Sequence, residues 1–170
     1  IRDTANSHNR MFIVEVMGRD AGFIALSAGV ATGALDIVLP EKNTTLEDLY
    51  ASIDRGAENT KTSNIIVVAE GNRLGKPFDL AKSLGTRYPE LDIKVTILGH
   101  IQRGGSPSAL DRVNASQLGV AAVESLLNGK SDIMVGLVNG QMTHTFLQQA
   151  IYNKAPLDME LFRVSKILSI

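Results

Sequence analysis

The nine residues from Gly99 to Pro107 (Gly-His-Ile-Gln-Arg-Gly-Gly-Ser-Pro) combine several groups that could bind an anion. The guanidinium of Arg103 offers a planar fork of donors that suits phosphate or carboxylate. The His100 ring donates to an anion whether it is neutral or charged. Gly104 and Gly105 allow the backbone to come close to a ligand or to turn sharply. The stretch therefore predicts an anion-binding loop, and the competing interpretation is a Gly-Gly loop with a solvated arginine.

Five apolar runs are typical of buried β-strands, because they are short and rich in Val, Ile and Leu. They are Met11–Met17, Asp36–Pro40, Asn64–Ala69, Ile93–Leu98 and Ile133–Val138. Helical patterns follow them at Gly22–Thr32 (ended by Gly33), from Asn43 with a capping-box spacing at Thr44 and Glu47, and at Pro77–Leu84, Ala109–Leu127, Thr143–Asn153 and Leu157–Ile170. This alternation predicts an α/β fold with a layered, mostly parallel sheet and helices on both faces.

Four of the predicted strands end in polar residues, at Gly18-Arg19, at Glu70, at His100 with Arg103, and at Asn139-Gly140-Gln141. The carboxyl ends of parallel strands share one edge of a sheet, and open α/β sheets bind ligands there. Cations and a carboxylate at one edge suit a ligand with phosphate and hydroxyl groups. The alternatives are a surface charge for Arg19, a helix cap or solvated acid for Glu70, and a structural hydrogen bond to backbone for His100.

Composition argues against several classes of protein. A net charge of -1 over 170 residues gives no overall basic field that would attract nucleic acid or an anionic membrane. The sequence has no Cys, and its three histidines, His8, His100 and His144, are too scattered to suggest a metal site. There is no Walker phosphate loop, dinucleotide-binding fingerprint or nucleophile elbow. We expect a cytoplasmic protein with no metal site of its own, no nucleic-acid partner and no membrane partner.

Several strings along the chain have a specific order and spacing. They are Ile1-Arg2-Asp3-Thr4, Ser7-His8 with Arg10, Val14-Glu15-Val16-Met17-Gly18-Arg19, Leu98 to Pro107, and Asp111-Arg112. Together they resemble the 6-phosphofructokinase family in its short bacterial form. The resemblance covers the whole chain but only the C-terminal half of such an enzyme, which agrees with a chain that does not begin with Met. It implies a sugar-phosphate-binding α/β lobe over residues 1–155 and a tail, 156–170, that packs on a missing N-terminal lobe.

The resemblance implies phosphorylation of fructose 6-phosphate to fructose 1,6-bisphosphate in glycolysis, with ATP as donor and Mg²⁺. The residues that it assigns to substrate binding are Arg10, Met17, Gly18, Arg19, Glu70, Lys94, His100, Ile101, Gln102 and Arg103. Arg19 would also reach the phosphoryl group in transfer and is the catalytic candidate. Glu70 and Arg103 would hold sugar hydroxyls, and His100 would contact the 6-phosphate.

Two of these cations would act across a subunit interface. The resemblance implies that Arg10 and Lys94 reach the 6-phosphate bound to a neighbouring subunit, and that the full-length enzyme is a homotetramer. Lys94 stands where the family usually has an arginine, so the charge is kept but the planar fork is lost.

The family's nucleotide loop and its catalytic base belong to the missing half, which would also hold most of the Mg²⁺ ligands. We therefore expect the isolated chain to be inactive. One alternative is a pyrophosphate-dependent enzyme, because the donor is selected mainly by that half. Another is a non-catalytic phosphosugar sensor, although such a protein would have no need of Arg19 at the transfer position.

The resemblance also implies a regulatory site for ADP or phosphoenolpyruvate between subunits. Arg2, Gly33 and Lys61 fall at its positions. Leu35 stands where the family commonly has an acidic residue that helps to hold the magnesium of ADP, and an alkyl side chain cannot ligate magnesium. We expect weak ADP activation, which a Leu35→Glu substitution would strengthen.

Overall fold

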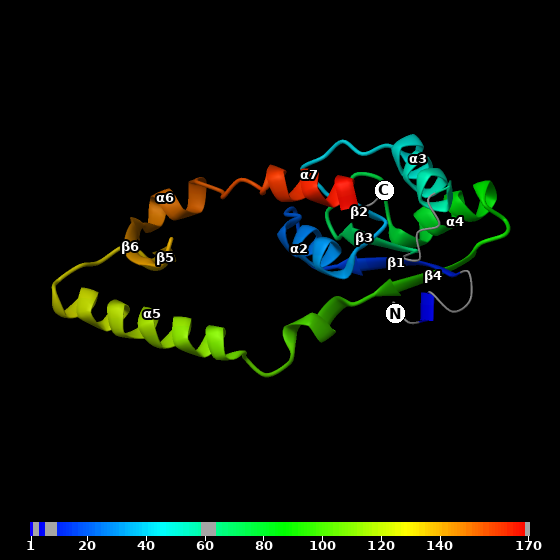
Figure 1. The fold of residues 1–170 in the computed structure, drawn as a ribbon. Coiled ribbons are helices and arrows are strands. Elements are labelled where there is room, and N and C mark those ends of the chain that lie inside the picture. Colours follow the sequence, from blue (N-terminus) through cyan, green and yellow to red (C-terminus); the bar gives the residue numbers. More distant parts are fainter. Residues whose placement is uncertain (2–3, 6–9, 59–63, 169–170) are drawn as a thin grey trace. The chain divides into compact units, whose positions relative to one another are not determined.

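The computed structural model describes residues 1, 4–5, 10–58 and 64–168 (Figure 1). The chain divides into two compact units. The sheet unit comprises Ile1–Arg103 and Leu157–Ile170, and the hairpin unit comprises Gly104–Pro156. The elements of the sheet unit are β1 (Arg10–Val16), α2 (Phe23–Thr32), β2 (Asp36–Val38), α3 (Leu46–Glu58), β3 (Ile65–Ala69), α4 (Pro77–Arg87), β4 (Asp92–Ile97), the 3-10 helix η1 (Gly99–Arg103) and α7 (Met159–Leu168).

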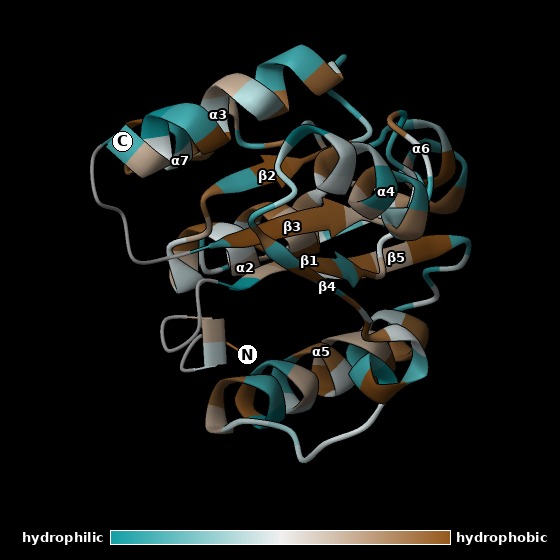
Figure 2. Cartoon of the chain, turned by 90° about the vertical axis from the view of Figure 1, so that its right-hand side faces the viewer, coloured by the Kyte–Doolittle hydropathy of each residue, from teal (hydrophilic) through white to brown (hydrophobic). Residues whose placement is uncertain are grey.

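A four-stranded sheet forms the centre of the sheet unit, with the order β2-β3-β1-β4. All three strand pairs are parallel, and Val16 at the end of β1 lies beside Ala69 at the end of β3. The strands β1 and β3 are coloured hydrophobic along most of their length in Figure 2, as expected for strands that helices cover on both faces. The expectation of an α/β fold with a mostly parallel sheet is confirmed.

Two apolar cores lie on opposite faces of this sheet. On one face, Leu26 of α2 and Phe162 of α7 pack against Val14 and Val67. On the other face, side chains of α3 and α4 such as Leu49 and Leu84 pack against the alternate strand residues, including Ile13 and Ile66. The period-two alternation of strand side chains explains why one strand serves both cores.

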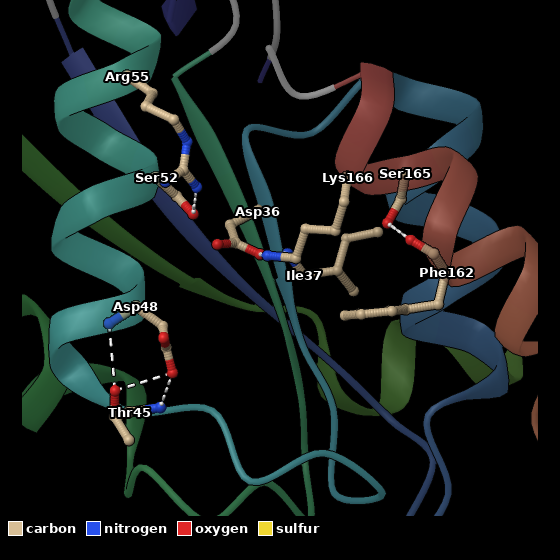
Figure 3. A network of polar contacts seen from close by, with 9 residues as sticks. All are labelled: Asp36, Ile37, Thr45, Asp48, Ser52, Arg55, Phe162, Ser165 and Lys166. Atoms are coloured by element: carbon tan, nitrogen blue, oxygen red, sulfur yellow. Dashed lines mark hydrogen bonds and ion pairs between the residues drawn. The ribbon is translucent and has the colours of Figure 1, made fainter.

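The helix α7 belongs to the sheet unit, although the whole hairpin unit precedes it in the chain. It contacts α2 and β2, and its Lys166 pairs with the carboxylate of Asp36 at the start of β2 (Figure 3). Asp36 is 2% exposed, and its Oδ2 has no hydrogen-bond partner among the described residues.

The sheet unit and the hairpin unit do not coincide with the division expected from the sequence, which separated residues 1–155 from 156–170. Whether residues 156–170 also pack on a missing lobe stays a prediction.

The hairpin unit contains α5 (Ala109–Leu127), β5 (Ile133–Val138), β6 (Gln141–Phe146) and α6 (Leu147–Tyr152). Here two expectations are wrong. The fifth strand does not join the parallel sheet but pairs antiparallel with β6, and the segment predicted as a helix from Thr143 begins as a strand. The cause is the pair Asn139-Gly140, which has φ values of 51° and 75° and forms the two-residue turn of a β-hairpin.

The capping box predicted at Thr44 and Glu47 lies one residue further along the chain. Thr45 accepts a hydrogen bond at its Oγ1 from the Asp48 amide (3.1 Å), and Asp48 accepts from the Thr45 amide (2.9 Å). In the hairpin unit, Ser108 and Asp111 form the same reciprocal arrangement at the start of α5. Both boxes satisfy amide groups that the first turn of a helix leaves without partners.

Candidate functional site

The turn after β1 is held by two side chains, Glu70 and Gln102, from the segments that follow the neighbouring strands β3 and β4. The Met17 amide donates to Gln102 Oε1 at 2.9 Å. Glu70 Oε2, just after β3, accepts from the amides of Gly18 (3.4 Å) and Arg19 (3.2 Å). Arg19 has a φ of 51°, in the left-handed region that non-glycine residues rarely occupy. The adjacent carboxyl ends of three parallel strands thus fix the backbone that carries Arg19.

Two glycines are required by the close packing of this turn. A Cβ atom at position 71 would lie 2.1 Å from the carbonyl oxygen of Arg19, and one at position 18 would lie 2.3 Å from that of Ala21. Both distances are far below van der Waals contact, and the obstructing atoms are backbone. Gly71 therefore allows the ends of β1 and β3 to approach each other, and Gly18 allows the chain to fold back tightly within the turn after β1.

A cleft of about 610 Å³ opens at this edge of the sheet. It is lined by Met17, Gly18, Arg19, Ile24, Glu70, Gln102 and Arg103. Two guanidinium groups and one carboxylate give it the mixture that suits a ligand with phosphate and hydroxyl groups. Six of these residues were predicted from the sequence. Ile24 was not, because an apolar residue in the first turn of a helix gives no chemical signal.

His100 and Ile101 lie in the 3-10 helix η1 together with Gln102 and Arg103. Both side chains are exposed, and neither belongs to the lining of the cleft. The structure therefore brings Gln102 and Arg103 to the cleft and leaves His100 and Ile101 beside it on the same turn.

Arg10 and Lys94 lie near the opposite edge of the sheet. Arg10 is the first residue of β1 and pairs in register with Asp92, the first residue of β4. Parallel strands place these positions at the amino edge, whereas Arg19 and Glu70 lie at the carboxyl edge. The described chain therefore does not bring Arg10 and Lys94 into the cleft.

Glu15 is a charged residue near the cleft that the sequence analysis did not select. Burial raises the pKa of its carboxyl, and the nearby charge of Glu70 raises it further. Its neighbours in register are Val68 and Ile97, which are apolar. The sequence did not identify Glu15 as a site residue, because a single acid in an apolar run forms no recognisable spacing with other polar residues.

The predicted effector residues have different outcomes. Arg2 and Lys61 lie outside the described residues. Gly33 has a left-handed backbone (φ 61°) and ends α2, which is a structural reason for glycine at that position. Leu35 is 2% exposed and packs in the apolar core beneath α3 and α4. A Leu35→Glu carboxylate would be buried among alkyl groups at a large free-energy cost, so this substitution is unsuited to create a magnesium ligand.

Among the described residues, no group of three or more His, Asp or Glu side chains could hold a metal ion. Within the same described part of the chain, none of the helices combines the length and the apolar character needed to cross a membrane.

The fold and the site together define an α/β protein with a cleft at the carboxyl edge of a parallel sheet, lined by two guanidinium groups and one carboxylate. The family model described as "Phosphofructokinase" matches residues 1–126. The chain belongs to the phosphofructokinase family.

Relatives with high identity are ATP-dependent enzymes. The chain is 44% identical over its whole length to "ATP-dependent 6-phosphofructokinase 2" of Bacteroides thetaiotaomicron, and 46% identical to "ATP-dependent 6-phosphofructokinase" of Brevibacillus brevis. It spans 52% of each of these proteins, about half of their length.

Solved structures share the fold. Phosphofructokinase from Saccharomyces cerevisiae matches with a TM-score of 0.79 and 34% identity, over 98% of this chain and 22% of that one. Pyrophosphate-dependent phosphofructokinase from Marinobacter aquaeolei matches with a TM-score of 0.76 and 25% identity, over 94% of this chain and 45% of that one.

Proposed function

We propose that this chain is the substrate-binding half of an ATP-dependent 6-phosphofructokinase of the cytoplasm. The enzyme would transfer a phosphoryl group from ATP to the 1-hydroxyl of fructose 6-phosphate and so supply glycolysis. The observation that carries the proposal is the convergence of Arg19, Glu70 and Arg103 on one cleft at the carboxyl edge. ATP is favoured over pyrophosphate as donor because the ATP-dependent relatives are 44% and 46% identical, whereas the pyrophosphate-dependent neighbour is 25% identical.

Glu70 would connect the sugar to the arginine that acts in transfer. One of its carboxylate oxygens already accepts from the amides of Gly18 and Arg19. A carboxylate has about four lone-pair sites, so it can accept from sugar hydroxyls in addition. Binding of the sugar would therefore fix Glu70, and through it the backbone turn that directs Arg19. Arg103 would donate to other sugar oxygens, and His100 beside it to the 6-phosphate.

The chemical step would be an in-line displacement in which positioning and charge stabilisation supply most of the catalysis. The 1-hydroxyl oxygen would form a bond to the γ-phosphorus, while the bond from that phosphorus to the oxygen that bridges it to the β-phosphorus breaks and ADP leaves with the bridging oxygen. Negative charge on the transferring group would be stabilised by Arg19. The proton of the hydroxyl would pass to a base in the half of the enzyme that this chain lacks. That half would also bind ATP and supply most of the ligands of the Mg²⁺ ion.

The isolated chain is expected to form no fructose 1,6-bisphosphate. An enzyme in which this chain supplies the C-terminal half, for example joined to the N-terminal half of the Brevibacillus brevis relative, is expected to turn over. Inactivity of the joined enzyme, with fructose 6-phosphate still bound, would instead favour a phosphosugar sensor. Turnover by the isolated chain would contradict the division into two halves.

The 6-phosphate subsite would be shared between subunits of a homotetramer. Support comes from the position of Arg10 and Lys94 at the amino edge, away from the cleft of their own chain. Removing either cation is expected to weaken fructose 6-phosphate binding by about ten- to a hundred-fold, the value of a charged hydrogen bond. Lys94→Arg is expected to be tolerated or to tighten binding, because it adds the planar fork.

The shared site can be tested by mixing two weak enzymes. Full-length Arg10→Ala is combined with full-length His100→Ala, and the subunits are allowed to exchange. If sites are shared, hybrid tetramers contain some interfaces with both residues intact, and activity exceeds the sum of the separate enzymes. Activity that stays at the sum after exchange is verified would overturn the shared site.

Regulation by ADP would be weak. Arg2, Gly33 and Lys61 remain candidates for an effector site between subunits, while the burial of Leu35 argues against a magnesium ligand at that position. Strong magnesium-dependent ADP activation of the full-length enzyme would contradict this part of the proposal.

A further inference from the structure

Asp92 holds two cations at the amino edge of the sheet, with one carboxylate oxygen for each. Arg10 Nε donates to Asp92 Oδ2 at 2.9 Å. Lys94 Nζ lies 2.7 Å from Asp92 Oδ1. Hydrogen bonds from Lys94 and then Arg10 hold the pKa of the Asp92 carboxyl below its usual value. The acid is therefore ionised at neutral pH.

The strand register makes this arrangement part of the fold. Arg10 and Asp92 are direct neighbours across β1 and β4. Lys94 lies two residues after Asp92, so both side chains leave β4 on the same face. The three side chains are 32%, 45% and 50% exposed, so the cluster faces solvent and an approaching anion can reach it.

We propose that Asp92 is a positioning residue for the phosphate subsite that Arg10 and Lys94 complete in a neighbouring subunit. The inference rests on the proposed function, because that function assigns the two cations to a phosphate. Asp92 binds Arg10 through Nε, so the terminal nitrogens of the guanidinium can meet the anion. It binds Lys94 through one ammonium proton and leaves the others for the same anion.

Two effects of Asp92 on an anion oppose each other. Its negative charge lowers the attraction that the two cations exert. Its hydrogen bonds keep two like charges together that would otherwise repel each other and separate. If Asp92 acted only through its charge, removing that charge would tighten substrate binding. If it acts as a positioning residue, removing it weakens binding.

The experiment uses the full-length enzyme with this chain as its C-terminal half. Asp92→Asn is expected to raise the KM for fructose 6-phosphate about two- to five-fold, the range of an exposed ion pair, with kcat unchanged. Glu90→Gln is the matched control. Glu90 is an exposed acid two residues earlier, so its replacement removes the same charge without removing the bonds. It is expected to leave KM unchanged or to lower it. Asp92→Glu is expected to restore part of the loss.

A double-mutant comparison separates positioning from a general effect on folding. In an enzyme that already carries Arg10→Ala and Lys94→Ala, Asp92→Asn is expected to raise KM no further, because the two side chains that it positions are gone. The inference is overturned if Asp92→Asn lowers KM in the otherwise unchanged enzyme, or if it still raises KM in the double-mutant background. If the loss of Arg10 and Lys94 alone leaves KM unchanged, the shared subsite itself is wrong and this inference fails with it. A normal response to those two losses, with no effect of Asp92→Asn, overturns the inference alone.

Discussion

The two units of the chain bury their apolar side chains to very different degrees. All of the buried hydrophobic side chains in the described part of the chain lie in the sheet unit, in the two cores on either side of the sheet. In the hairpin unit, which is described throughout, Ser125 is the only buried residue. Burial of apolar surface is the main favourable contribution to folding. The sheet unit therefore has a core of its own, and the hairpin unit does not.

The hairpin unit instead exposes many large apolar side chains. They include Leu110, Val113, Val120, Val123, Leu126, Leu127, Val138, Phe146, Ile151 and Tyr152. Between α5 and the hairpin lies a groove of about 500 Å³, whose lining includes Val120, Leu137 and Met142. Exposed apolar surface of this extent indicates an interaction surface. The difference between the units supports the proposal that this chain is one half of a larger enzyme.

The largest expected difference concerns two leucines of similar helical context. Leu84 in α4 is 0% exposed and Leu127 in α5 is 82% exposed. Leu84→Ala is expected to lower the free energy of unfolding by about 2–5 kcal/mol, because it removes buried methyl groups and leaves a cavity. Leu127→Ala is expected to change it by less than about 0.5 kcal/mol. Urea unfolding of the isolated chain measures both, and equal effects would remove the contrast between the units.

A smaller effect is expected from a tyrosine that joins two helices of the sheet unit. The Tyr88 hydroxyl donates to Asp54 Oδ1 at 2.8 Å. Burial, followed by this hydrogen bond, raises the pKa of Tyr88 to about 12. Because the folded pKa exceeds the unfolded value of about 10, the stabilisation is complete below pH 10 and is lost as the pH rises through 12.

Tyr88→Phe is therefore expected to cost about 1–2 kcal/mol at pH 7 and less as the pH approaches 12. The difference in unfolding free energy between the two proteins is measured from pH 7 to pH 11. The control is Tyr152→Phe in the hairpin unit, which removes a hydroxyl from a tyrosine that is 82% exposed. A cost at Tyr88 that does not change with pH would contradict the assigned hydrogen bond.

The smallest effect concerns the same helix cap in each unit. Thr45→Ala removes the side chain that caps α3, and Ser108→Ala removes the one that caps α5. Each loss is expected to destabilise its helix by about 1 kcal/mol. Hydrogen exchange is the measurement, because it reports each helix separately. Thr45→Ala is expected to lower amide protection throughout the sheet unit, and Ser108→Ala only in α5. A global effect of Ser108→Ala would show that the units unfold together.

The parallel sheet could be predicted from the sequence, whereas the hairpin was missed. Strands that helices cover on both faces are nearly continuous apolar runs, and β1 and β3 have that pattern. The signal for the hairpin was present in Asn139-Gly140, the dipeptide most typical of a tight hairpin turn. The run before this dipeptide has the same composition as the strands of the parallel sheet, so its pattern alone does not distinguish a hairpin strand from a parallel one.

The candidate site could be predicted only in part. Arg19, Glu70 and Arg103 were identified because they follow strands, and their convergence depends on topology alone. The bond from Met17 to Gln102 and the pair of Asp92 with Arg10 join residues 85 and 82 positions apart. Such contacts depend on strand register and side-chain geometry, which a single sequence does not display.

The tie between Asp36 and Lys166 has a consequence for the order in which the chain can fold during synthesis. The two residues are 130 positions apart, and the ribosome makes the entire hairpin unit between them. Until α7 emerges, the buried carboxylate at the start of β2 lacks its cation, and Leu26 and its neighbours on one face of the sheet lack Phe162. The nascent sheet unit therefore lacks α7 on one face of its sheet while the 53 residues of the hairpin unit, Gly104–Pro156, pass through the exit tunnel.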